Sequence, residues 1–157
     1  KVEELFEKFE SARGGERKQA LVKEICTELS IHAKIEEEVF YPACKGKIEE
    51  EDMLDEAYVE HDGAKVLIAE LAQASPDDEF YDAKVKVLSE LIKHHVKEEE
   101  RPREGVFAQA REAELDLAVL GERLKARKEE LMKEFEGGDN LPPPETRSYH
   151  GHKLVQS

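Results

Sequence analysis

The sequence predicts an all-α protein, an up-and-down four-helix bundle with an additional C-terminal helix and an irregular tail. Leu, Glu, Lys and Ala dominate its 157 residues and β-branched residues are sparse, which favours helices over strands. Apolar residues recur at spacings of three and four in several long segments, the pattern of helices that bury one face. Short breaker segments separate these stretches, and short connections are typical of an up-and-down bundle.

Four segments carry the predicted bundle helices: 1–12, 16–44, 50–74 and 79–100. The pair Gly14-Gly15 ends the first of them, and Gly46 ends the second. Pro76 ends the third, because proline disfavours helical backbone at the preceding residue, and the aspartates that follow it can cap the fourth. Each helix is therefore joined to the next by a short loop, which suits antiparallel neighbours.

Beyond the bundle, a break at 101–105 precedes a short helical stretch over 106–111 and a fifth helix over 114–135. A leucine edge on the fifth helix predicts that it packs across the outside or the end of the bundle. The Gly-Gly-Asp-Asn-Leu-Pro-Pro-Pro run after it disfavours regular structure. We therefore predict a helical bundle domain over 1–136 and a Gly/Pro-rich tail over 137–157.

The charge and the cysteines of the chain restrict its partners and its compartment. A formal net charge of −14 argues against nucleic acid and anionic membranes, since both attract basic surfaces. No apolar run approaches the roughly 20 residues of a membrane span. Cys26 and Cys44 lie in one predicted helix, about 27 Å apart, too far for a disulfide. Unless they pair between chains both are thiols, which predicts a reducing, cytoplasmic setting and leaves the oligomeric state open.

Two motifs of the form His-x3-Glu, His32 to Glu36 and His95 to Glu99, are the strongest functional signal. Residues i and i+4 of a helix project from one face with their Cβ atoms about 6 Å apart, so an imidazole and a carboxylate can converge on one small volume. Such a motif also arises by chance in any Glu-rich helical protein. Its position on the helix therefore decides whether it has chemical meaning.

Both motifs lie on the apolar stripes of their helices. His32 and Glu36 continue the stripe of the second predicted helix, His61 that of the third, and His95 and Glu99 that of the fourth. A buried carboxylate is costly unless it is paired or bound to a metal. Each residue alone is compatible with a core histidine or a partly exposed glutamate, but the five together predict a metal site.

The second of two adjacent histidines is the better candidate on the fourth predicted helix. His94 could pair with Glu98 at the same spacing as His95 with Glu99. His94, however, lies about 100° around the helix, toward the edge of the stripe, whereas His95 and Glu99 continue its apolar face. We therefore favour His95 as the metal ligand, with His94 as a solvated imidazole or one that orients a ligand.

Three sequence blocks resemble the hemerythrin-like, or HHE cation-binding, domains. They are LSIHAKIEEEVFYP at 29–42, Glu-His at 60–61 and HHVKEEE at 94–100, and the likeness covers roughly 1–135. The ordered set of blocks is specific, although each alone is not. The resemblance implies a non-haem di-iron centre inside a four-helix bundle. It also implies the role of each candidate: terminal ligands at His32, His61 and His95, and bridging carboxylates at Glu36 and Glu99.

The sequence departs from the family pattern in two places. The family normally has a histidine on the first helix, and extending the apolar stripe backwards predicts one just upstream of Lys1 in the full-length protein. Animal hemerythrins that carry O₂ have a further histidine four residues after the one matched by His61, where this chain has Lys65. The predicted site is therefore poorer in nitrogen than that of an O₂ carrier, which disfavours reversible O₂ carriage.

The donor types support the same prediction without the family. Imidazole and carboxylate together suit iron, manganese or zinc, and the absence of a cysteine ligand argues against a structural zinc site. The resemblance implies two non-haem iron ions, and the donor types leave manganese or zinc as alternatives. Five protein ligands for two ions leave coordination positions at which O₂, NO or peroxide could bind.

Several functions follow from such a centre. The leading hypothesis is a protein that binds or senses O₂, NO or peroxide. The alternatives are an enzyme that decomposes peroxide or oxidises ferrous iron, an iron buffer, and a helical interaction domain with a vestigial site. Tyr41 and Tyr58 could lie beside the metals, but we interpret both as boundary tyrosines whose hydroxyls reach water.

Overall fold

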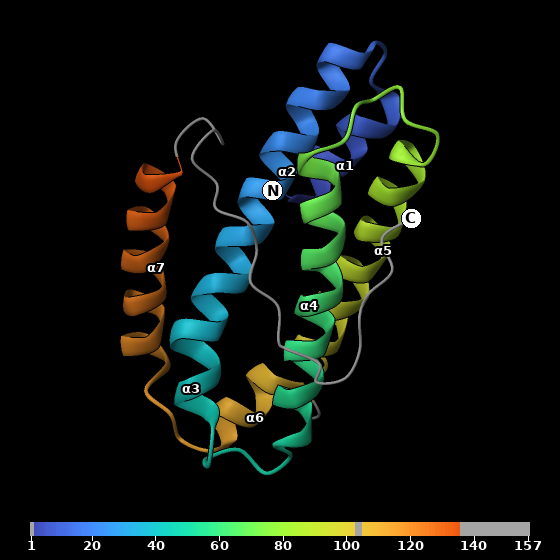
Figure 1. Ribbon diagram of the computed structural model, residues 1–157. Helices are drawn as coiled ribbons and strands as arrows, with labels where there is room; N and C mark the ends of the chain where they lie inside the picture. The colour runs from blue at the N-terminus through green and yellow to red at the C-terminus, as the bar shows by residue number, and fades with distance from the viewer. Residues whose placement is uncertain (1, 103–104, 136–157) are drawn as a thin grey trace, which may run out of the picture.

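The computed structural model describes residues 2–102 and 105–135 (Figure 1). All its regular elements are helical: α1 (Val2–Ser11), α2 (Gly15–Ile35), η1 (Glu36–Phe40), α3 (Tyr41–Cys44), α4 (Asp52–Ala72), α5 (Tyr81–Glu99), α6 (Val106–Glu112) and α7 (Leu117–Glu134). Within the described ranges there is no strand, so the predicted all-α class is confirmed. The predicted tail over 137–157, and with it the domain boundary after residue 136, lies outside the described residues.

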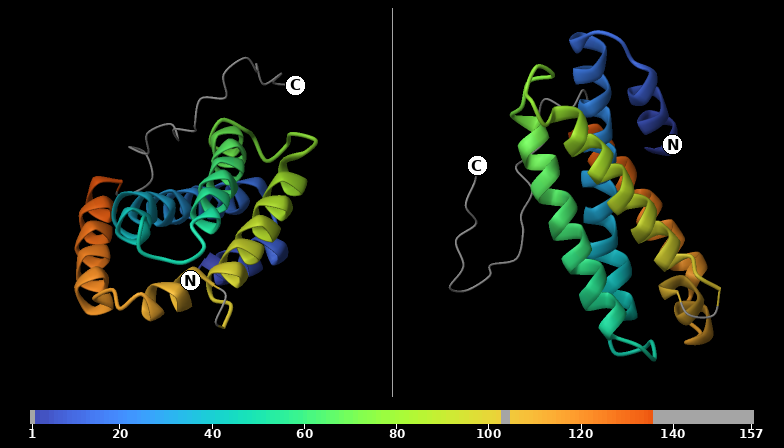
Figure 2. Two further views of the ribbon diagram at one scale, coloured as in Figure 1. Left: turned by 90° about the horizontal axis from the view of Figure 1, so that it is seen from below. Right: turned by 90° about the vertical axis from the view of Figure 1, so that its right-hand side faces the viewer.

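The bundle is built around α2, which lies between α7 on one side and the α4–α5 pair on the other (Figures 1 and 2). The short α1 folds back against α2 and α5 near one end of the bundle. At the opposite end α6 links α5 to α7, and α7 packs along α2 and η1. The C-terminal helix therefore packs on the outside of the bundle, as its leucine edge predicts.

The predicted helix over 16–44 is not continuous. A π-helical turn, η1, separates α2 from α3, and the backbone N–H of Tyr41 donates to the carbonyl of Glu36, five residues earlier. Pro42 supplies a physical reason, since it has no N–H for the carbonyl of Glu38 and its ring clashes with a regular helical turn there. The apolar spacing gives no signal of this turn. The other predicted helices are confirmed, with ends shifted by a few residues.

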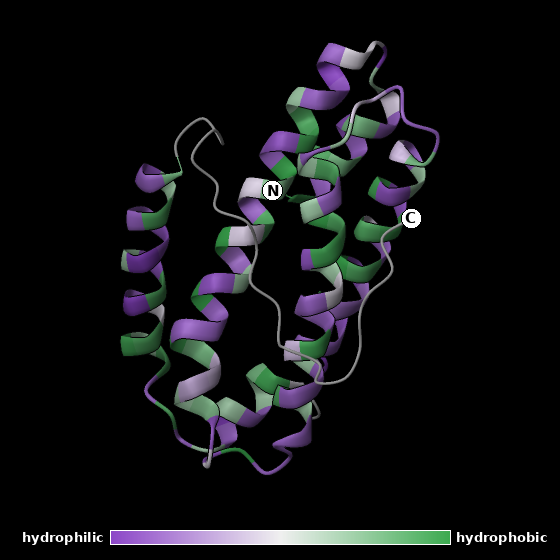
Figure 3. Cartoon of the chain, viewed as in Figure 1, coloured by the Kyte–Doolittle hydropathy of each residue, from purple (hydrophilic) through white to green (hydrophobic). Residues whose placement is uncertain are grey.

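Two hydrophobic clusters flank a polar layer at the middle of the bundle. One cluster joins α1, α2, α4 and α5 and includes Phe9, Ile25 and Leu88. The other joins η1, α3, α4, α6 and α7 and includes Cys44 and Ala110. Each helix carries its hydrophobic residues in stripes beside hydrophilic ones (Figure 3). No helix among the described residues is both long and apolar enough to cross a membrane.

The reactivity of the two cysteine thiols provides a test of how these clusters pack. Cys26 and Cys44 form no disulfide, and both are buried. Burial raises the pKa of Cys26 to about 12, and burial together with the charge of Glu99 raises the pKa of Cys44 to about 11. Because the thiolate is the nucleophile, neither cysteine is expected to react with an aromatic disulfide reagent at pH 8 until the protein is unfolded. Rapid labelling of either thiol in the native protein would contradict this packing.

Gly105 lies so close to the end of α5 that a larger residue cannot fit. A Cβ atom there would overlap the backbone oxygen of Glu99 and lie 2.8 Å from the backbone N and O of Arg101. Gly105→Ala is therefore expected to lower the free energy of unfolding by about 1–3 kcal/mol, measured by urea titration.

The matched control is Gly63→Ala in the interior of α4, where a Cβ meets no atom within 4 Å. Because glycine is entropically unfavourable in a helix, this variant is expected to gain about 0.5–1 kcal/mol. Equal effects of the two substitutions would contradict the close approach at Gly105.

Candidate metal centre

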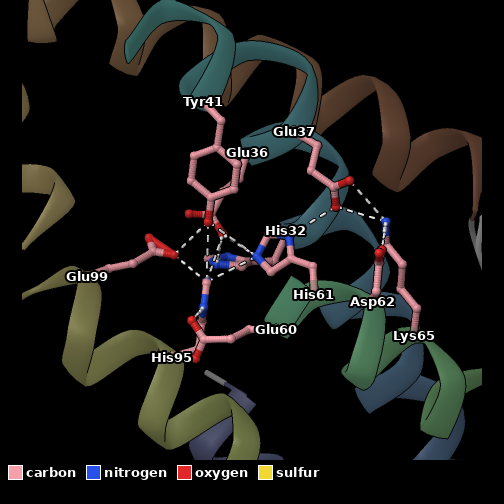
Figure 4. Close-up of polar contacts among 10 residues, drawn as sticks. All are labelled: His32, Glu36, Glu37, Tyr41, Glu60, His61, Asp62, Lys65, His95 and Glu99. Atoms are coloured by element: carbon pink, nitrogen blue, oxygen red, sulfur yellow. Dashed lines mark hydrogen bonds and ion pairs between the residues drawn. The ribbon is translucent and has the colours of Figure 1, made fainter. Parts of the chain in front are cut away.

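Four buried residues from three segments of the bundle converge in the polar layer. Glu36 begins η1, His61 lies on α4, and His95 and Glu99 lie one turn apart on α5. Each offers one ligand atom, and these four atoms all lie within 4.8 Å of one another (Figure 4). The structure thus brings together four of the five residues that the sequence predicts for the site.

His32 occupies a different position from the other four. Its Nε2 lies 2.7 Å from Oε1 of Glu36, yet 48% of its side chain is exposed. The prediction that all five residues are buried is therefore wrong for His32. Its ring borders a cavity of about 300 Å³ between α1, α2, α5 and α7, so packing closes only one side of it. His32 contacts the cluster through Glu36 from the direction of this cavity.

The choice between the adjacent histidines of α5 is also visible. His95 lies in the buried cluster, whereas 63% of the His94 side chain is exposed and its Nε2 lies 3.6 Å from Oε2 of Glu60. His94 is therefore a solvated imidazole beside a carboxylate, as expected for the edge of the stripe.

Two carboxylates outside the cluster orient its histidines. Nδ1 of His61 lies 3.0 Å from Oε2 of Glu37, and Nδ1 of His95 lies 3.4 Å from Oε1 of Glu60. Since a carboxylate accepts hydrogen bonds, each Nδ1 carries a proton and each Nε2 faces the centre, where the two Nε2 atoms are 3.0 Å apart. Carboxylates that hold metal-binding histidines in this way are a regular feature of metal sites.

Lys65 contacts one of the carboxylates that orient the histidines. Its Nζ lies 3.0 Å from Oε1 and 2.9 Å from Oε2 of Glu37, and 3.8 Å from Oδ1 of Asp62. The lysine therefore pairs with the carboxylate that orients His61 and supplies no nitrogen to the cluster. Sequence reasoning missed Glu37 and Glu60, although each is the sequence neighbour of a predicted site residue.

The donor set fits a metal ion. Oε1 of Glu36 lies 2.7, 3.4 and 3.7 Å from the Nε2 atoms of His32, His61 and His95, but it makes no hydrogen bond of normal geometry. A buried polar atom without such a partner is rare and costly. A cation bound among these imidazole nitrogens and carboxylate oxygens would satisfy them together.

The charges of the cluster are strongly coupled. Burial acts to raise the pKa of Glu36, but three neighbouring histidines outweigh it and hold that pKa far below its usual range. Burial opposes a proton on His95, yet contacts with Glu36 and Glu99 raise the pKa of His95 to about 10. Burial and the charge of Glu36 raise the pKa of Glu99. Metal binding therefore has to displace protons, so its affinity falls as the pH falls.

The hydroxyl of Tyr41 lies among the donor atoms of the cluster. It is fully buried, its hydroxyl donates to Oε1 of Glu99 at 2.9 Å, and its oxygen lies 3.3 Å from Nε2 of both His61 and His95. The interpretation of Tyr41 as a boundary residue is therefore wrong. The reason is the π-helical turn, which changes the face on which residue 41 projects. Tyr58 is half-buried and packs its ring edge-on against that of Tyr41.

A small cavity adjoins the histidines. It has a volume of about 20 Å³, and it is lined by His32, His61 and His95, by Lys65, and by apolar side chains that include Ala64 and Ile68. This is room for one water-sized or diatomic molecule. The arrangement can therefore place a small ligand beside the donor cluster.

Comparisons with known proteins point to one family. The profile of the hemerythrin HHE cation-binding domain matches residues 1–102. A protein from Nostoc sp. (strain PCC 7120 / SAG 25.82 / UTEX 2576) named DNA nickase is 30% identical over 100 residues, which cover 64% of this chain and 28% of that protein. The chain therefore spans less than a third of the length of this relative. No solved structure matches the chain.

Proposed function

The chain belongs to the hemerythrin HHE cation-binding family, and from this premise we propose that it is a non-haem iron protein that binds or senses O₂, NO or peroxide. The observation that carries the proposal is the convergence of Glu36, His61, His95 and Glu99 within the bundle. Imidazole and carboxylate donors suit iron, and they also suit manganese or zinc.

The residues of the proposed centre offer two kinds of donor. His32, His61 and His95 would hold the iron through imidazole nitrogens, and Glu36 and Glu99 would hold it through carboxylate oxygens. When bound, the iron supplies open coordination positions and a redox couple. The protein residues orient the imidazoles, neutralise the metal charge and exclude water.

Access to the centre supports a small ligand. The cavity of about 300 Å³ and the cavity of about 20 Å³ share several lining residues: Leu29, His32, Ile92 and Val96. A molecule entering from the surface would therefore pass His32 before it reached the imidazoles of His61 and His95. The size of the inner cavity favours a diatomic molecule or a compact oxidant over a larger substrate.

A second candidate function is redox turnover, either peroxide decomposition or oxidation of ferrous iron. Glu36 and Glu99 favour redox turnover, because oxygen ligands stabilise ferric iron. Lys65 favours it as well, because it supplies no nitrogen to the centre, and a site poor in nitrogen is less suited to reversible O₂ carriage. Iron buffering and a helical interaction domain with a vestigial site are weaker candidates, because neither needs the inner cavity.

DNA cleavage is not proposed, since a net charge of −14 opposes binding to a phosphate backbone. The two buried thiols support a reducing, cytoplasmic setting.

The deciding experiment loads the protein with ferrous iron without oxygen and then measures metal content, visible absorption and melting temperature before and after exposure to air. Two irons per chain and the spectrum of a carboxylate-bridged ferric pair support the proposal. Reversal under vacuum indicates carriage, and peroxide or ferrous loss far above one per site indicates an enzyme. Less than one metal per chain, with a melting temperature indifferent to iron, contradicts the proposal and favours a vestigial site.

A further inference from the structure

We propose that Tyr41 is itself a ligand of the metal centre, bound to ferric iron through its deprotonated phenol oxygen. This inference rests on the proposed function. The hydroxyl oxygen lies 2.9 Å from Oε1 of Glu99 and 3.3 Å from Nε2 of His61 and of His95, so it is positioned among the donor atoms rather than beside them (Figure 4). Any cation that contacts these three groups also lies within reach of the phenol oxygen.

The backbone is built to bring Tyr41 there. Residues five apart in a regular α-helix project about 140° from each other, so Tyr41 would point away from the face that carries Glu36. The π-helical turn between them closes with the hydrogen bond from the N–H of Tyr41 to the carbonyl of Glu36 and brings both side chains onto one face. Turns of this kind are rare and are frequently found at functional sites.

The ring of Tyr41 is held in place by its aromatic neighbours. The ring of Tyr58 packs edge-on with its centroid 5.2 Å away, and that of Phe40 lies 5.9 Å away. Tyr41 has no exposed surface. The hydroxyl therefore cannot turn toward water without repacking the hydrophobic cluster below the site, and it stays directed at the centre.

The lone pairs of the phenol oxygen are positioned for ligation. A phenol has one proton, and here it is donated to Glu99, which leaves the oxygen lone pairs facing the imidazoles of His61 and His95. A metal ion among these groups would use those lone pairs.

The binding step is a simple exchange of a proton for a metal. The O–H bond of Tyr41 breaks, the oxygen–iron bond forms and the proton leaves to bulk water, with no electron transferred. Tyrosinate is an established iron ligand in proteins, for example of haem in catalase. With Glu36 and Glu99 it gives the centre three anionic oxygen donors, which favours the ferric state.

The test compares wild type with Tyr41→Phe and Tyr58→Phe after loading with ferrous iron and oxidation in air. Tyr58→Phe is the matched control, because it removes a neighbouring hydroxyl from a ring that packs against Tyr41. Wild type and Tyr58→Phe are expected to show a visible phenolate-to-iron charge-transfer band and resonance-enhanced tyrosinate vibrations. Tyr41→Phe is expected to lose both signals while it retains bound iron.

The outcomes separate this inference from the proposed function. Iron-loaded wild type without tyrosinate vibrations, or equal vibrations in Tyr41→Phe, overturns the ligand and leaves the iron centre standing. Absence of bound iron in wild type overturns both. Should Tyr41→Phe fail to fold by circular dichroism, wild type and Tyr58→Phe carrying ring-deuterated tyrosine decide. Isotope shifts of the enhanced bands in both support the ligand, and unshifted bands or loss of the bands in Tyr58→Phe overturn it.

Discussion

Replacement of Glu36 and Glu99 together by alanine is expected to abolish iron binding. These are the two carboxylates inside the cluster, and without them the imidazoles supply no negative charge and the proposed Tyr41 ligand alone cannot offset two buried cations. Wild type at free metal 100-fold above its dissociation constant should gain about 2.7 kcal/mol of stability, and the double variant should gain none. Metal analysis and urea unfolding with and without iron measure both effects.

The matched control removes two carboxylates from the same helices but outside the cluster. Glu38 pairs with Arg127 and Glu98 lies 3.9 Å from Arg101, and the side chains of both glutamates are more than a third exposed. Surface pairs of this kind contribute about 0–1 kcal/mol, so the double alanine variant of Glu38 and Glu98 should bind iron like wild type. Full iron stoichiometry in the Glu36 and Glu99 variant would disprove the assignment of the site.

Apolar periodicity predicts most of the helices and the residues of the inner cluster. The stripes identify which side chains share a buried face, and that is enough to place Glu36, His61, His95 and Glu99 in one layer. Periodicity along one helix does not predict how the neighbouring helices pack against each of its residues. His32 shares the stripe, but it borders a cavity instead of a packed core, and only tertiary structure reveals this.

Sequence reasoning missed the roles of some site residues for two physical reasons. The prediction for Tyr41 is wrong because a π-helical turn changes the register of the helix, and the hydrophobic pattern does not indicate that change. Glu37 and Glu60 are off the buried stripes and reach the histidines from neighbouring helices. In the run Glu36-Glu37-Glu38 all three side chains are chemically alike. Their separate roles depend on which of α4, α5 and α7 each one meets.

Glu37→Gln is expected to weaken metal binding about 10–100-fold, because substitutions of carboxylates that orient metal-binding histidines typically have effects of this size. Glu37 accepts the Nδ1–H of His61 and pairs with Lys65, and these two partners outweigh burial and lower the pKa of Glu37. A neutral amide loses the charge that both contacts use. Titration of iron or zinc against a competing chelator measures the change in dissociation constant.

Glu38→Gln is the control, because it neutralises the adjacent glutamate, which pairs with Arg127 on the outside of the bundle. It should leave the dissociation constant unchanged. If Lys65 acts on the centre through Glu37, Lys65→Met should weaken binding less than Glu37→Gln, and the double variant should be no worse than Glu37→Gln alone. Additive losses would mean that Lys65 acts on the metal independently, and an unchanged affinity in Glu37→Gln would mean that the Glu37 contacts are only structural.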